Sequence, residues 1–174
     1  AMDLLLVHGV TAVRTHVNVL ESIGATAVKA VLEAASEFEG LLDVQVVALC
    51  GSPLTGRNGA GTRAALVDAL EAGAHLVGGC PHLDPDGVGL IDIALRAATE
   101  AGIGVDLHVD EMLDPTVLTL RDLAQAVLTT GFAGLVAASH CVTLRMQTAA
   151  VQREVSDLVA EAGIAVFPLP QTNL

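Results

Sequence analysis

Three side chains that can do chemistry follow a short apolar stretch near the middle of the chain. Residues Val105 to Glu111 read Val-Asp-Leu-His-Val-Asp-Glu, which places His108, Asp110 and Glu111 at the end of a predicted buried strand. Imidazole nitrogens and carboxylate oxygens bind divalent metals, and a carboxylate beside an activated water can move protons. The segment indicates a metal-assisted catalytic site, or else polar groups that only form hydrogen bonds in the core.

A second apolar stretch, Leu135–Ser139, also ends in a histidine, His140. One segment of helical length separates the two stretches, so both histidines should emerge from neighbouring parallel strands at the same edge of the sheet. We therefore expect His108, Glu111 and His140 to lie within reach of one metal ion or water. Arg14 and His16 are polar residues within another apolar run, and we expect them to form a buried polar network.

The positions of these residues depend on a strand–helix alternation that is repeated six times. The predicted strands are Ala12–Val17, Val44–Leu49, Leu76–Gly79, Gly104–His108, Leu135–Ser139 and Ala165–Leu169. The predicted helices are Ile23–Glu39, Gly61–Ala72, Val88–Ala101, Leu118–Thr130 and Thr148–Ala162. Continuous apolar strands between helices are typical of a parallel α/β sheet that is covered on both faces. No linker or change in composition interrupts the pattern, so we interpret residues 1–174 as a single domain.

Two architectures fit such an alternation, an open doubly wound sheet and a closed barrel. An open sheet that binds dinucleotides should carry G-x-G-x-x-G after its first strand, and this motif is missing there. Polar residues follow almost every predicted strand, namely Arg14 and His16, Ser52, His82 and Asp84, His108 and Glu111, His140, and Asn173. This loading of the strand ends favours a TIM-type barrel, although a closed barrel needs eight units and the chain supplies six.

Composition restricts the partners. The net charge is −12 and there is no basic run, which argues against nucleic acid or an anionic membrane as a partner. The apolar run Leu4–Val7 is too short for a signal peptide or a membrane span, so we expect a cytoplasmic protein. The three cysteines are widely spaced and are interpreted as free thiols of a reducing compartment.

Five segments, taken together, resemble the metal-dependent amidohydrolase superfamily, specifically its bacterial cytosine deaminase-like branch. In chain order they are residues 8–17 (HGVTAVRTHV), 78–82 (GGCPH), 106–111 (DLHVDE), 138–140 (ASH) and 168–174 (PLPQTNL). The resemblance covers the whole chain. It implies a TIM-type (β/α) barrel, incomplete here because the chain corresponds to strands two to seven, six of the eight βα units.

The resemblance also implies roles for individual residues. His108 would be a metal ligand on strand five, and Glu111 the acid/base that shuttles protons between the hydrolytic water and the substrate. His140, at the end of strand six, would touch the metal or orient its water. Asn173 matches a family segment and would contact the substrate. His82, in a loop with Asp84 and Asp86, would either line the substrate pocket or lie on the loop surface. The implied cofactor is a divalent metal, zinc or iron, and the implied substrate is a small nitrogen heterocycle or an amide.

The sequence departs from the family pattern in two respects. The superfamily completes its metal site with a His-x-His pair on strand one and an Asp on strand eight, and we expect both to be absent from these 174 residues. Cytosine deaminases also carry a Gln after strand three, where residues 49–53 here read Leu-Cys-Gly-Ser-Pro. The missing amide leaves the substrate open.

Two hypotheses follow. The chain is a cytosine deaminase-like amidohydrolase that hydrolyses a C–N bond, or it is a catalytically silent truncated barrel. In either case the first and last strands should present unpaired edges, from which we expect a homo-oligomer.

Overall fold

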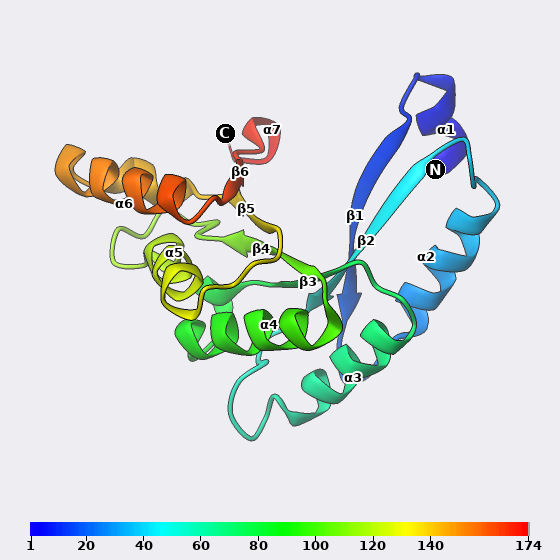
Figure 1. The fold of residues 1–174 in the computed structure, drawn as a ribbon, viewed down its shortest axis with the longest axis horizontal. Helices are drawn as coiled ribbons and strands as arrows, with labels where there is room; N and C mark the ends of the chain where they lie inside the picture. The colour runs from blue at the N-terminus through cyan, green and yellow to red at the C-terminus, as the bar shows by residue number, and fades with distance from the viewer. Residues whose placement is uncertain (174) are drawn as a thin grey trace.

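The computed structural model describes the backbone of residues 1–173 and the side chains of residues 1–172. Six parallel strands form one sheet in sequence order (Figure 1). They are β1 (Ala12–Val19), β2 (Asp43–Cys50), β3 (Leu76–Gly79), β4 (Gly104–Val109), β5 (Val136–His140) and β6 (Ala165–Phe167). Because each strand pairs with the next one in sequence, no switch point divides the sheet, and all strand carboxyl ends lie along the same edge.

The sheet is strongly curved. The guanidinium Nη1 of Arg14 in β1 lies 2.7 Å from Oδ2 of Asp106 in β4. The guanidinium carbon of Arg14 lies 5.9 Å from the ring centroid of Phe167 in β6. In a flat sheet, with strands about 4.8 Å apart, β1 and β4 would be separated by roughly 14 Å. These contacts therefore require the six strands to curl into a half-barrel with a concave and a convex face.

The main helices cover the convex face of this half-barrel (Figure 1). The helices are α1 (Met2–Val7), α2 (Thr26–Ser36), α3 (Ala60–Glu71), α4 (Gly87–Ala101), α5 (Thr119–Thr130), α6 (Ala149–Glu161) and α7 (Pro170–Asn173), with two 3-10 turns, η1 (Pro81–Leu83) and η2 (Val142–Met146). The core between strands and helices is built from small and aliphatic side chains, among them Val28, Val46, Leu66, Leu90, Leu123 and Val155. No helix in the described part of the chain is long and apolar enough to cross a membrane.

The sequence located all six strands, and most element ends agree to within two residues. The strand β6 ends at Phe167 and not at Leu169, because Pro168 has no N–H to donate and Leu169 has a positive φ of 44°. The helix α2 is shorter than the predicted Ile23–Glu39, since a turn closed by Gly24 N–H donating to Leu20 O precedes it. The short helix α7 after the last strand was not predicted.

Asp110, directly after β4, caps the N-terminus of α5 with its side chain. Its side chain is fully buried, and its carboxylate accepts hydrogen bonds from the Thr119 hydroxyl at 2.6 Å and from the N–H groups of Thr119 and Leu120 at 2.9 and 3.1 Å. The first N–H groups of a helix have no partner within the helix, and this carboxylate accepts hydrogen bonds from them. Its negative charge also interacts favourably with the positive end of the helix dipole. Asp110 also has a positive φ of 52°, a conformation that Asp and Asn tolerate better than most residues.

We expect Asp110→Ala to lower the free energy of unfolding by about 2–4 kcal/mol, because each buried N–H group left unpaired costs roughly 1–3 kcal/mol. Asp110→Asn keeps one acceptor oxygen and tolerates the same backbone conformation, so its loss should be smaller. Urea unfolding followed by circular dichroism measures both. A loss of less than about 0.5 kcal/mol for Asp110→Ala would contradict the capping role.

Candidate functional site

A cavity of about 840 Å³ opens on the concave face of the half-barrel. Side chains of β1, β2, β4, β5 and β6 line it, and the cavity includes His108, Glu111 and His140. These three residues lie at or just beyond the carboxyl ends of β4 and β5, which pair so that His108 is opposite Ser139 and Val109 is opposite His140. The structure therefore brings together the three residues on which the sequence analysis centred.

The three side chains are close enough to bind one ion. One potential ligand atom from each of His108, Glu111 and His140 lies within 4.8 Å of the other two. Nδ1 of His140 is 3.4 Å from Oε1 of Glu111, and the ring centroids of His108 and His140 are 4.8 Å apart with the planes tilted by 66°. Two imidazoles and a carboxylate in this arrangement are a donor set that zinc and iron accept.

The backbone after β5 is bent so that His140 can enter the cavity. Successive residues of a regular strand point to opposite faces, yet Ser139 and His140 both line the cavity. His140 and Cys141 have positive φ values of 74° and 53°, which breaks the alternation at this point. Such conformations are costly for residues with a side chain, and they cluster at functional sites.

The electrostatics of His108 suit a metal ligand. Burial and the neighbouring His16 and His140 lower the pKa of His108 to about 4. The imidazole is therefore neutral at physiological pH and keeps a nitrogen lone pair available for a metal ion. The residues present thus fit a divalent metal both in donor type and in protonation.

The cysteines near the strand ends are not arranged as metal ligands. Burial raises the pKa of Cys50 to about 12, and burial together with Glu111 raises that of Cys80 to about 11. Burial likewise raises the pKa of Cys141 to about 12. Thiols with such pKa values remain protonated, and metals bind the thiolate. All three cysteines are free, as the sequence indicated.

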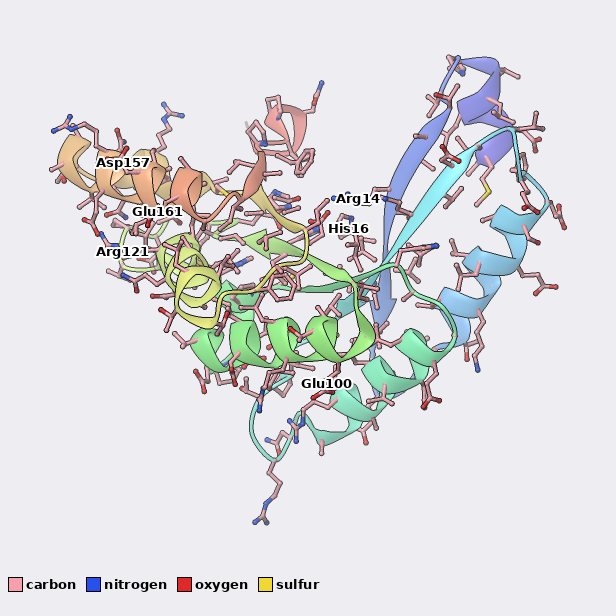
Figure 2. The ribbon with its side chains drawn as sticks, in the orientation of Figure 1. Arg14, His16, Glu100, Arg121, Asp157 and Glu161 are labelled. Carbon is pink, nitrogen blue, oxygen red and sulfur yellow. The ribbon has the colours of Figure 1, made fainter. Side chains whose placement is uncertain are left out.

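A polar network crosses the concave face beside the three residues. Figure 2 shows Arg14 and His16 extending from β1 toward the other strands. Oδ2 of Asp106 accepts from Arg14 Nη1, while Oδ1 is 3.4 Å from both His16 Nε2 and the Ser139 hydroxyl. Gln45 Oε1 accepts from Arg14 Nε and Nη2 at 3.0 and 2.9 Å. Burial by itself would raise the pKa of Asp106, but the neighbouring His16 imidazole and Arg14 guanidinium lower it below its ordinary value.

The two predicted substrate contacts are placed differently. His82 lies in η1, and its Nδ1 is 3.1 Å from the backbone carbonyl oxygen of His108. It therefore contacts the main chain of His108 and not its imidazole ring. It is not among the side chains that line the cavity. Asn173 ends α7 by its backbone, but its side chain lies outside the described part of the structure.

Sequence reasoning expected Arg14 and His16 in a buried network but did not name their partner, Asp106. The signal was present: Arg14 and His16, like Asp106 and His108, are polar residues spaced two apart in otherwise apolar strands. This spacing puts both members of each pair on one face of the sheet.

Comparison with known proteins places these observations in a family. No family model matches the chain. The chain is 36% identical over 167 residues to pterin deaminase of Rhizobium rhizogenes (strain K84 / ATCC BAA-868), covering 96% of this chain and 38% of that protein. It is 33% identical over 137 residues to N-isopropylammelide isopropyl amidohydrolase of Pseudomonas sp. (strain ADP), covering 78% of this chain and 34% of that protein.

A solved structure agrees with these relatives. The 5-methylcytosine deaminase of Klebsiella pneumoniae, liganded with 5-fluorocytosine, superimposes with a TM-score of 0.84 at 31% identity, covering 95% of this chain and 40% of that one. The chain thus spans well under half the length of the proteins it matches. These homologues are deaminases and amidohydrolases of the amidohydrolase superfamily, and this chain is similar to a part of each of them.

Proposed function

We propose that the chain supplies part of the active site of a metal-dependent deaminase or related amidohydrolase, which hydrolyses a C–N bond of a nitrogen heterocycle or amide. The observation that carries this proposal is the convergence of His108, Glu111 and His140, with ligand atoms within 4.8 Å of one another, at the carboxyl ends of two adjacent strands. Relatives at 31–36% identity are deaminases or amidohydrolases that act on heterocycles. The half-barrel would form strands two to seven of a TIM-type barrel.

His108 is the proposed metal ligand of this site. Its lowered pKa keeps the imidazole neutral, and its packing between His16 and His140 restricts the ring. A divalent metal, zinc or iron, would lower the pKa of a bound water toward ~7 and so provide a hydrolytic nucleophile at neutral pH.

Glu111 is the proposed proton carrier. Its side chain is 38% exposed, so it can reach water and substrate while it remains 3.4 Å from His140 Nδ1. A carboxylate in this position can accept a proton from the attacking water and deliver it to the substrate ring or to the leaving group. His140 is buried and can direct a ring nitrogen at the same water, which would orient the attack and stabilise the charge that develops.

The substrate is proposed only as a class. Its reacting C–N bond would lie above His108 and Glu111, in the cavity that Phe167 and Leu169 also line. A planar heterocycle suits such a mixture of apolar and polar walls. Residues 49–53 contain no amide side chain of the kind that selects cytosine, so cytosine is not preferred over other heterocycles here.

A second reading is that these 174 residues are catalytically silent on their own. Catalytic zinc normally takes three protein ligands. If Glu111 carries protons, His108 and His140 leave only two, and no other cluster of metal-ligating residues occurs in the described part of the chain. In this reading the site is completed by protein outside the segment.

Metal binding and ammonia release separate these readings. We expect the chain to bind Zn²⁺, and His108→Ala to weaken binding by more than the ~10–100-fold that loss of an outer partner costs. Elemental analysis and chelator competition measure this. If the chain is active, Glu111→Gln should retain metal yet lower ammonia release from pterin or cytosine by roughly 10²–10⁴-fold.

His8→Ala is the matched control, since His8 is an exposed histidine whose Nδ1 contacts only Leu4 O among the described residues. Its metal content should equal that of the parent chain. Bound metal without any ammonia release would favour the silent reading. If His108→Ala and His8→Ala bind Zn²⁺ equally well, the proposed site is wrong.

We further propose that the chain associates with itself. The outer strands β1 and β6 each pair with one neighbour, and Leu135, Val166 and Phe167 near the β5–β6 edge are 52%, 43% and 45% exposed. Unpaired edges with apolar residues tend to pair with other chains. Light scattering should give a mass of at least twice 17.7 kDa, and Val166→Lys should reduce it. A cooperative monomer would contradict this proposal.

A further inference from the structure

We propose that Asp106 is a positioning residue of the candidate metal centre, which fixes the ring of His108 through His16. This inference rests on the proposed function, because it assumes that His108 binds a metal. The contacts among Asp106, His16 and His108 themselves are present without a metal. Asp106 is 2% exposed and lies two residues before His108 on the same face of β4. It points into the cavity that His108 also lines.

Both oxygens of Asp106 are held in place. Arg14 Nη1 donates to Oδ2 at 2.7 Å, and the Ser139 hydroxyl lies 3.4 Å from Oδ1. Gln45 in turn holds the Arg14 guanidinium through two hydrogen bonds. The carboxylate is therefore anchored from β1 and from β5, and its orientation does not depend on His108.

His16 carries the effect of Asp106 to the metal-ligand candidate. Nε2 of His16 is buried and lies 3.4 Å from Asp106 Oδ1, within ion-pair range but long for a hydrogen bond. The ring centroid of His16 is 4.6 Å from that of His108, with the planes tilted by 59°. Asp106 thus restrains one ring, and that ring packs directly against His108.

His108 needs this support because no described group makes a hydrogen bond to its ring. Metal-binding histidines usually donate their second ring nitrogen to a carboxylate or carbonyl, which fixes the ring and its tautomer. Here the rings of His16 and His140 pack on His108 instead. Asp106 therefore does not contact the His108 ring itself; it contacts His16, whose ring packs against His108.

The test compares the metal-free chain with Asp106→Asn by NMR of ring-¹⁵N-labelled histidines at constant pH. We expect the His108 ring nitrogens to change their tautomer ratio or broaden in the variant. Zn²⁺ affinity, measured by chelator competition, should fall about 10–100-fold, as for loss of an outer partner of a ligand. Unchanged His108 signals in folded Asp106→Asn would overturn the proposal, whatever the chain does with Zn²⁺.

His16→Phe tests the route. It keeps a flat ring against His108 but removes the nitrogen that faces Asp106. In this background Asp106→Asn should have no further effect on the His108 signals or on Zn²⁺ affinity, because contacting residues in one path are not additive. Fully additive effects would overturn the proposal. If Asp106→Asn does not fold, His16→Leu removes the packed ring and must itself alter the His108 signals.

Two controls separate positioning from general loosening. Gln45→Ala removes the other anchor of Arg14, one contact further from His108, so it should change the His108 signals less than Asp106→Asn does. Val155 is a buried core residue of α6 and does not line the cavity. Val155→Ala should therefore lower the melting temperature without shifting the His108 signals. Equal changes in His108 for Val155→Ala and Asp106→Asn would overturn the proposal. If the parent chain binds no Zn²⁺, the proposed metal site fails, while the NMR comparison still decides the role of Asp106.

Discussion

The ion pair between Arg14 and Asp106 is the interaction on which the concave face depends. It joins the first and fourth strands across the inside of the sheet, with atoms 2.7 Å apart. A carboxylate that is 2% exposed would be very costly without a partner, so folding must bring β1 toward β4. Gly78 of β3 pairs with Asp106, and a larger residue does not fit there, since a Cβ would meet Val47 Cγ1 at 2.7 Å and the Asp106 carbonyl oxygen at 3.1 Å.

Much of the fold was predictable because it depends on local signals. Each strand is a continuous apolar run between helical patterns, which is the sequence pattern typical of a parallel sheet covered on both faces. The proximity of His108 and His140 was predictable for the same reason, since strands adjacent in sequence are adjacent in the sheet. The Arg14–Asp106 contact was not predictable, because residues 92 positions apart meet only through curvature, which no local pattern encodes.

The loops after the strands show the same limit. Asp110, directly after β4, and His140, at the end of β5, are both polar residues with positive φ at the end of a strand. The structure separates them: the carboxylate of Asp110 turns toward α5 and caps it, while His140 turns into the cavity. Both residues have a positive φ, so the direction of the side chain, toward α5 or into the cavity, decides whether it serves stability or chemistry. His82 shows the same dependence, because its loop carries it to the carbonyl of His108 and not to the cavity wall.

Stability and chemistry are thus divided between the two faces of the same strands. Along β1, Val17 and Val19 are buried on the helix side, while Arg14 and His16 alternate with them on the concave side. Barrel interiors are usually filled by branched apolar side chains, but here the middle strands contribute small residues and the space holds charged and imidazole groups. The convex face must therefore supply most of the hydrophobic stabilisation, and its Val- and Leu-rich core beneath the helices does so. Because the concave face adds little to that core, most of its side chains can be arranged for binding and proton transfer, provided that the buried carboxylate of Asp106 keeps its partner Arg14.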